Sequence, residues 1–272
     1  MKAVSKTILA LSIAAGLFGA ANASAATSVF NPFTVSAPDG KVFQADKIVG
    51  DYYEIATFNP DGTFTVSLEW AAGQFVKDSI LPTHHAYSSA ESGLGQDYNV
   101  YGVYMASGTV SQSGTKTIFT FTPGSGALTI FLDNNNDTTI THSPINGTDP
   151  YGFGNTSDDR VLATGVALAG QGILDSSLPD CGAGQGGINC GSFGSTTTFS
   201  LSSPVGTSFF TAPVPFYDLS FQSGQLDNFD PTGTQYITGS LDMTFRRVPE
   251  PASLGLLGLG LLGLGFARRR KQ

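Results

Sequence analysis

The chain has 272 residues, of which only 12% are charged, while glycine (34) and phenylalanine (20) are abundant. This composition is a poor match for a helical protein and favours a β-rich fold with many turns. Residues 26–247 contain seven basic residues against 20 acidic ones, a net charge near −13. Nucleic acid and anionic lipid, which bind basic surfaces, are therefore poor partners for this part of the chain, and divalent cations are better ones.

The first 25 residues have the organisation of a secretory signal peptide. Lys2 and Lys6 form a basic start, residues 8–18 are apolar, and Ala23 and Ala25 are the small residues that signal peptidase reads. We expect cleavage after Ala25, with Ala23 as the alternative site. A retained N-terminal anchor is the other interpretation, but the apolar run is short.

Residues 26–247 are predicted to form one β-rich extracytoplasmic domain. Its clearest element is a hairpin over residues 51–70, because a turn sequence at 59–62 precedes an alternation of Phe64, Val66, Leu68 and Trp70 with polar residues. Further strands are expected within residues 99–110, 115–123, 126–133, 160–170, 195–203 and 236–248. Many short strands bounded by Gly, Pro, Asn or Ser predict an all-β, antiparallel β-sandwich or jelly-roll-like body.

The three histidines offer little for catalysis. His84 and His85 are adjacent, so on a strand they point to opposite faces, and His142 is distant in sequence. No Gly-x-Ser-x-Gly elbow is present. Paired carboxylates of a glycoside hydrolase remain an alternative, although the body has only three Glu residues and one Trp. We therefore expect no enzymatic activity.

The segment "FLDNNNDTTI" offers oxygen ligands after an apolar strand. Asp133, Asn135 and Asp137 alternate there, as in the first half of a calcium-binding EF-hand loop. Thr138 and Pro144 stand where that loop needs Gly and Glu, so a looser site would need help from Asp149, Asp158 or Asp159. A polar turn without a metal is the alternative, since Asn and Asp favour turns.

Tyrosines at 98, 101 and 104 could stack on sugar faces or pack in the protein interior. Farther along, Cys181 and Cys190 are the two cysteines of the chain and bracket a glycine-rich loop. In an exported protein, such a pair predicts one disulfide rather than a metal site.

The C-terminal segment, residues 248–272, combines three features. Val248, Pro249, Glu250 and Pro251 precede the uncharged run 252–267, and a basic tail follows with Arg268, Arg269, Arg270 and Lys271. As a helix, that run would span about 24 Å, less than the roughly 30 Å hydrocarbon core. We expect a short transmembrane helix that holds the protein temporarily, with the basic tail in the cytoplasm.

This arrangement resembles the PEP-CTERM sorting signal of Gram-negative bacteria that make exopolysaccharide. The resemblance implies that a membrane-embedded exosortase, a separate protein, recognises the motif and removes the helix. A plain C-terminal anchor behind a proline-rich stalk is the alternative. Residues 26–70, with "FNPFTV" and "ADKIVGDYYE", further resemble the start of the flocculation-associated PEP-CTERM (PepA-like) family.

These resemblances imply an exported, exosortase-sorted surface or extracellular matrix protein. It would promote flocculation or biofilm formation together with exopolysaccharide, after a stage of inner-membrane anchoring. Two alternatives remain open at this point, a secreted hydrolase acting on polysaccharide and a calcium-dependent, lectin-like carbohydrate-binding module.

Overall fold

A computed structural model describes residues 31–78, 84–182, 187, 189–223 and 226–246. The predicted signal peptide, sorting motif, short transmembrane helix and basic tail all lie outside these residues. Among the residues that the structure describes, none of the helices has the length and apolar character needed to cross a membrane.

The described chain is mostly β-structure, as predicted, with antiparallel pairing between the named strands. The large sheet contains β3 (Lys47–Phe58), β4 (Thr63–Lys77), β5 (His85–Ala86), β6 (Asn99–Ser113), β7 (Lys116–Phe121), β8 (Ala127–Asp133), β11 (Arg160–Asp175), β12 (Gly191–Thr197), β13 (Ser200–Leu201), β15 (Asp218–Ser223) and β16 (Gly233–Arg246).

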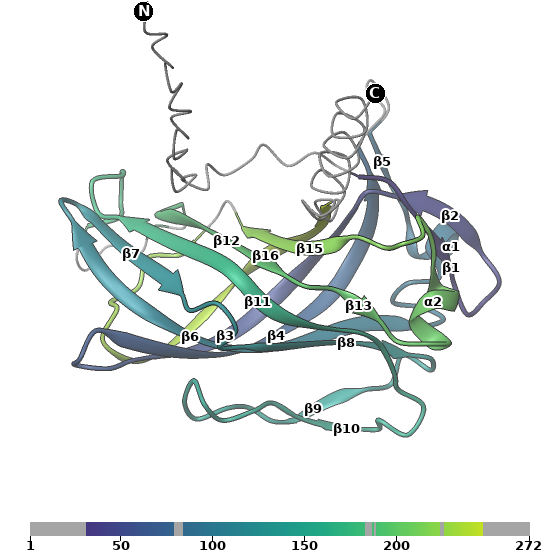
Figure 1. The fold of residues 1–272 in the computed structure, drawn as a ribbon, viewed down its shortest axis with the longest axis horizontal. Coiled ribbons are helices and arrows are strands. Elements are labelled where there is room, and N and C mark those ends of the chain that lie inside the picture. The colour runs from purple at the N-terminus through teal and green to yellow at the C-terminus, as the bar shows by residue number, and fades with distance from the viewer. Residues whose placement is uncertain (1–30, 79–83, 183–186, 188, 224–225, 247–272) are drawn as a thin grey trace, which may run out of the picture.

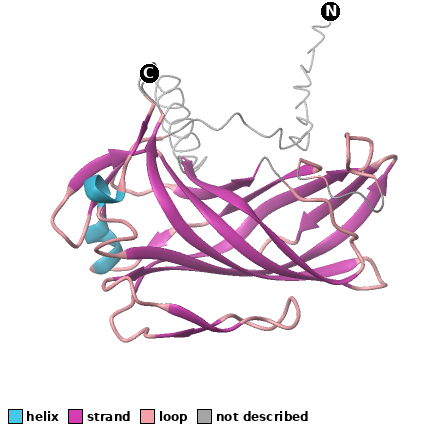
Figure 2. Cartoon of the chain, turned by 180° about the vertical axis from the view of Figure 1, so that it is seen from behind, coloured by secondary structure: helices cyan, strands magenta, loops and turns pink. Residues whose placement is uncertain are grey.

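This sheet closes on itself. β3 pairs with β4, β4 with β6, and β6 with both β7 and β8, which together occupy one position beside β11. β11 then pairs with β12, β12 with β15, β15 with β16, and β16 returns to β3. The strands follow one another around the ring in chain order, and Figures 1 and 2 show them wrapping around a common interior.

The closed sheet is where the structure departs from the expected sandwich or jelly roll, in which two separate sheets stack. An alternation of apolar and polar residues indicates that one face of a strand is buried. The same alternation is expected when two sheets stack and when one sheet closes around its own core. The pairing of β4 with β6 distinguishes the two folds, and no local pattern encodes that pairing.

The hairpin predicted over residues 51–70 is confirmed within β3 and β4. The N–H of Asn59 donates to the carbonyl oxygen of Thr63 across the turn at 2.8 Å. Gly62 adopts a φ of +80°, a left-handed conformation that glycine accepts without strain. Phe64, Val66 and Trp70 face the interior and are buried. The indole of Trp70 passes over Gly50 of β3 and donates a hydrogen bond to the carbonyl oxygen of Leu241 at 3.1 Å, which ties β4 to β16 across the strand between them.

Smaller elements cover one end of the closed sheet. They are the sheet of β1 (Phe33–Ser36), β2 (Val42–Ala45) and β14 (Phe210–Ala212), and the helices α1 (Ser89–Ser92) and α2 (Val205–Phe209). Figure 2 shows both helices at the same end. Aromatic rings fill the contact, with Phe33 against Phe245 at 4.8 Å and Phe210 against Phe216 at 5.1 Å between centroids.

A long excursion, residues 134–159, leaves the sheet between β8 and β11. It contains the hairpin of β9 (Thr139–His142) and β10 (Gly152–Gly154), which lies outside the ring in Figure 1. Gly147 donates its N–H to Oγ1 of Thr57 at 2.9 Å, and the Tyr151 hydroxyl donates to the carbonyl oxygen of Tyr53 at 3.0 Å. The excursion therefore covers the outer face of β3 and β4.

Cys181 and Cys190 form the predicted disulfide, with their Cα atoms 5.3 Å apart. The backbone of Cys190 donates to the carbonyl oxygen of Leu226 at 2.9 Å, and Leu226 donates to that of Gly191 at 3.2 Å. The disulfide loop thus holds the connection between β15 and β16 at the end of the ring opposite the helices.

Replacing both cysteines by serine should lower the free energy of unfolding by about 2–3 kcal/mol, because the short loop gains entropy in the unfolded chain. Urea unfolding of the purified protein, followed by the fluorescence of Trp70, measures this difference. Reductant added to the wild type should reproduce the loss and leave the double variant unaffected. Equal stability of the two proteins under oxidising conditions would contradict a stabilising disulfide.

Candidate functional site

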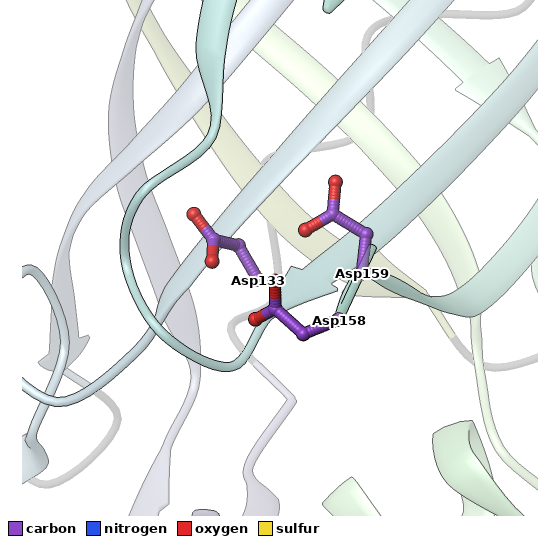
Figure 3. A group of neighbouring side chains, drawn as sticks. All are labelled: Asp133, Asp158 and Asp159. Carbon is purple, nitrogen blue, oxygen red and sulfur yellow. The ribbon is translucent and has the colours of Figure 1, made fainter. Parts of the chain in front are cut away.

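The candidate site lies where the excursion leaves and rejoins the closed sheet. Asp133 is the last residue of β8, and Asp158 and Asp159 come directly before β11. β8 and β11 are antiparallel neighbours, with Leu132 opposite Arg160, so the end of one strand meets the start of the other. This pairing brings together three carboxylates that are about 25 residues apart in the chain (Figure 3).

One carboxylate oxygen from each of Asp133, Asp158 and Asp159 lies within 4.8 Å of the others. Asp133 is only 1% exposed, whereas Asp158 and Asp159 are partly exposed. All three donor atoms are oxygens on residues that fixed strand ends hold in place, which is the kind of ligand set that Ca²⁺ prefers.

Backbone and hydroxyl donors orient these carboxylates. The N–H of Asn135 donates to Oδ2 of Asp158 at 2.9 Å, and the N–H of Thr138 donates to Oδ2 of Asp133 at 3.0 Å. The Thr138 hydroxyl donates to Oδ1 of Asp159 at 2.9 Å. Each carboxylate has two oxygens, so these bonds leave lone pairs on the group available to a cation.

A fourth carboxylate, that of Asp137, interacts electrostatically with the other three. Its pKa is raised by partial loss of hydration and by the negative charges of Asp158, Asp133 and Asp159. Among the described residues, no ion pair joins a basic side chain to any of these four carboxylates. The site is therefore strongly negative, and a divalent cation would relieve the repulsion.

The three metal ligands predicted from sequence do not form the cluster together, because each has a different position in the structure. Asp133 is the buried member of the cluster, Asp137 lies beside it, and Asn135 contributes its backbone N–H while its side chain is exposed. Asp158 and Asp159, named from sequence only as helpers, are central members. The local spacing of the Asp residues could not reveal this, because the cluster depends on the pairing of β8 with β11.

The third helper considered from sequence, Asp149, lies elsewhere. Its carboxylate contacts His142 Nε2 at 2.9 Å and accepts from the N–H of Ile145 at 2.9 Å. His142 and the neighbouring backbone lower the pKa of Asp149, the backbone bond having the larger effect. This pair stabilises the excursion hairpin and does not belong to the cluster.

The other histidines also pair with single carboxylates. Nδ1 of His84 contacts Asp78, and Nε2 of His85 lies 3.3 Å from Glu91. The two imidazoles have different partners, as expected for adjacent residues, and neither joins His142 in a shared site.

Aromatic rings adjoin the acidic cluster. The Tyr101 hydroxyl donates to Oδ2 of Asp159 at 2.5 Å, and the Tyr101 ring stacks on Phe131 with centroids 5.0 Å apart. Tyr98, Tyr101 and Tyr104 are all buried, so these three tyrosines pack within the protein rather than forming an exposed platform for sugars.

The C-terminal segment supplies the most specific functional feature of the chain. Residues 247–271 match the model of the PEP-CTERM protein-sorting motif. The chain carries a PEP-CTERM sorting signal. The match spans Val248–Pro251, the apolar run and the basic tail, in agreement with the sequence interpretation.

This sorting motif indicates exosortase-dependent export to the cell surface, through a sorting signal that is anchored in the membrane until exosortase processes the chain. No curated protein matches the chain, and no solved structure does. The role of residues 31–246 is therefore argued from their own chemistry.

Proposed function

We propose that the protein is a cell-surface or extracellular matrix protein that promotes cell aggregation, in flocculation and biofilm formation, together with exopolysaccharide. The PEP-CTERM motif at residues 247–271 is the observation that carries this proposal, since it directs the chain to the surface. The resemblance of residues 26–70 to flocculation-associated proteins supports the aggregating role. Signal peptidase would remove residues 1–25 before exosortase acts.

The exported body would act by binding rather than by catalysis. Its net charge near −13 disfavours direct contact with acidic polysaccharide, because like charges repel. A divalent cation held by carboxylates on the protein and on the polysaccharide would remove this repulsion and link the two. The cluster of Asp133, Asp158 and Asp159 is the place where the protein gathers carboxylates for such a cation.

We assign Ca²⁺ to this cluster because the donors are oxygens only, and because Ca²⁺ accepts irregular geometry and several ligands. Asp133 would be the buried anchor, and the more exposed Asp158 and Asp159 would face the partner. Asp137 would contribute charge. Partly open coordination positions would leave room for a carboxylate or hydroxyl pair of the polysaccharide.

Replacing Asp158 and Asp159 by asparagine should weaken Ca²⁺ binding by at least about ten-fold, because two charges are lost from the site. Isothermal titration of the exported protein with CaCl₂ measures this change. Asp149→Asn is the matched control, since Asp149 pairs with His142 outside the cluster, and it should leave the affinity unchanged. Equal Ca²⁺ affinity of the double variant and the wild type would show that this cluster does not bind Ca²⁺.

A calcium-dependent, lectin-like module is the second candidate, favoured by the partly exposed carboxylates of Asp158 and Asp159, on which a bound cation would be accessible to sugar hydroxyls. Such a module would bind neutral sugars through the cation as well. Co-sedimentation of the exported protein with the host exopolysaccharide tests both candidates. Pelleting that chelator abolishes supports a bridging cation, and pelleting with neutral glycans supports the lectin. Shortened polysaccharide chains would instead indicate a hydrolase and contradict both.

A further inference from the structure

The closed sheet encloses a small cavity of about 30 Å³ near the end held by the disulfide loop. Phenylalanines from four strands and the connection between β15 and β16 make up half of its lining residues, namely Phe58, Phe64, Phe119, Phe121, Phe193 and Phe229. These rings pack against one another, with Phe119 and Phe229 stacked at 5.6 Å. Glu54 of β3 also lines this apolar cavity.

The carboxylate of Glu54 has no hydrogen bond or ion pair with any described residue. Its strand neighbours on the same face are Leu68 of β4 and Ile237 of β16, which are apolar and buried. Burial raises the pKa of Glu54 to about 7. An ionised carboxylate in such surroundings is costly unless a counter-charge accompanies it.

The charge of Glu54 acts on two neighbouring tyrosines. Burial raises the pKa of Tyr52, which also lines the cavity, and the charges of Glu54 and Asp227 raise it further. Burial likewise raises the pKa of Tyr104, with a contribution from Glu54. No basic side chain is among the lining residues.

The connection between β15 and β16 contributes Leu226 and Phe229 to the cavity wall. This connection is fixed to the disulfide loop, because Cys190 donates to Leu226 at 2.9 Å and Asn228 donates to the carbonyl oxygen of Gly187 at 2.9 Å. Asp227 belongs to the same connection, and its charge acts on Tyr52 of the cavity wall.

We propose that this cavity binds a small organic cation, a primary ammonium group of about methylammonium size, with Glu54 as its counter-ion and the phenylalanine rings as its wall. The carboxylate supplies a charge-assisted hydrogen bond, and ring faces attract a desolvated cation. The small volume limits the group that enters to about the size of one or two water molecules. This binding is separate from the cation cluster at Asp133 and from the surface role.

The experiment follows the side-chain carboxyl signals of ¹³C-glutamate in the exported protein, with methylammonium chloride or sodium chloride at equal concentration. The Glu54 signal is assigned by its absence from the Glu54→Gln variant. At ten times the Kd, methylammonium should lower the titration midpoint of Glu54 by about one pH unit, because it binds the ionised form. Glu69, which is buried on the opposite face of β4, is the internal control and should not respond.

Thermal unfolding above pH 7 provides a second readout. Methylammonium should raise the melting temperature of the wild type and of Glu69→Gln, and it should leave Glu54→Gln unchanged relative to sodium. Identical Glu54 midpoints in the two salts, or an equal thermal shift in Glu54→Gln, would overturn the proposal and show that the cavity holds only water.

Discussion

Replacing Val248, Pro249, Glu250 and Pro251 together by alanine should block processing and leave full-length protein in the inner membrane. Residues 249–251 place a carboxylate between two prolines, and proline disfavours helix both at its own position and at the preceding residue. The motif would therefore remain extended next to the membrane, where exosortase can reach it. Alanine would instead allow the following helix to continue through the motif.

The effect should be close to complete, with the processed form falling from the main species to a trace. Fractionation of cells and medium, followed by detection of an internal tag, measures the ratio of unprocessed to processed chain. Gln272→Ala is the control, because it changes the one C-terminal residue beyond the matched segment. Normal release of the alanine variant would count heavily against exosortase sorting and favour a plain membrane anchor.

The second large expected effect concerns Glu69, a carboxylate buried on the outer face of β4. Glu69 is 4% exposed, and its Oε2 atom has no hydrogen-bond partner within the described part of the chain. It lies opposite Tyr53 of β3, on the face that the excursion covers. Burial raises the pKa of Glu69 to about 7, from 4.5.

Because the folded protein holds this proton more tightly than the unfolded chain does, the stability from protonated Glu69 is fully present below about pH 4.5. It is lost as the pH rises toward 7. A pKa difference of about 2.5 units corresponds to about 3 kcal/mol, as an upper limit. The wild type should thus be less stable at pH 8 than a variant in which Glu69 carries no charge.

Glu69→Gln should raise the free energy of unfolding at pH 8 by up to about 3 kcal/mol and have little effect near pH 4. Urea unfolding of both proteins across this range measures the difference. The pKa of Glu54 is also raised to about 7, so both proteins contain a second pH-dependent contribution to stability. The difference in the free energy of unfolding between the variant and the wild type removes this shared contribution.

Glu91→Gln is the matched control, because Glu91 is exposed and its pKa is lowered by hydrogen bonds to the backbone and hydroxyl of Ser88. Its effect should be smaller and of opposite sign above the normal carboxylate pKa. A pH-independent difference between Glu69→Gln and the wild type would show that Glu69 is not a buried titrating group.

The predicted hairpin and disulfide depended on local signals, and for this reason the sequence was sufficient for both. The Asn59–Gly62 turn and the alternation of β4 are short-range patterns, as is the spacing of Cys181 and Cys190. The buried outer face of β4 had no such signal. Glu69 is one of the polar residues that alternate with the apolar residues of β4, and it is buried because the excursion of residues 134–159 returns over β3 and β4.

The closed sheet and the acidic cluster needed long-range information. β4 and β6 pair over residues 63–71 and 101–109, and nothing in either strand's alternation specifies that partner. In the same way, Asp133 meets Asp158 and Asp159 only because β8 pairs with β11. The sequence therefore indicated Asp133 and an oxygen-rich site, but not that Asp158 and Asp159, rather than Asn135 and Asp137, complete the cluster.

The most direct test of the surface role is deletion of the gene in its own host, with cell aggregation and exopolysaccharide yield scored together. The account predicts that aggregation is lost while polysaccharide yield is unchanged, and that adding the purified body, residues 26–247, restores aggregation only when calcium is present. Unchanged aggregation, with a shift in polysaccharide chain length, would contradict the account and point to a polysaccharide-cleaving enzyme.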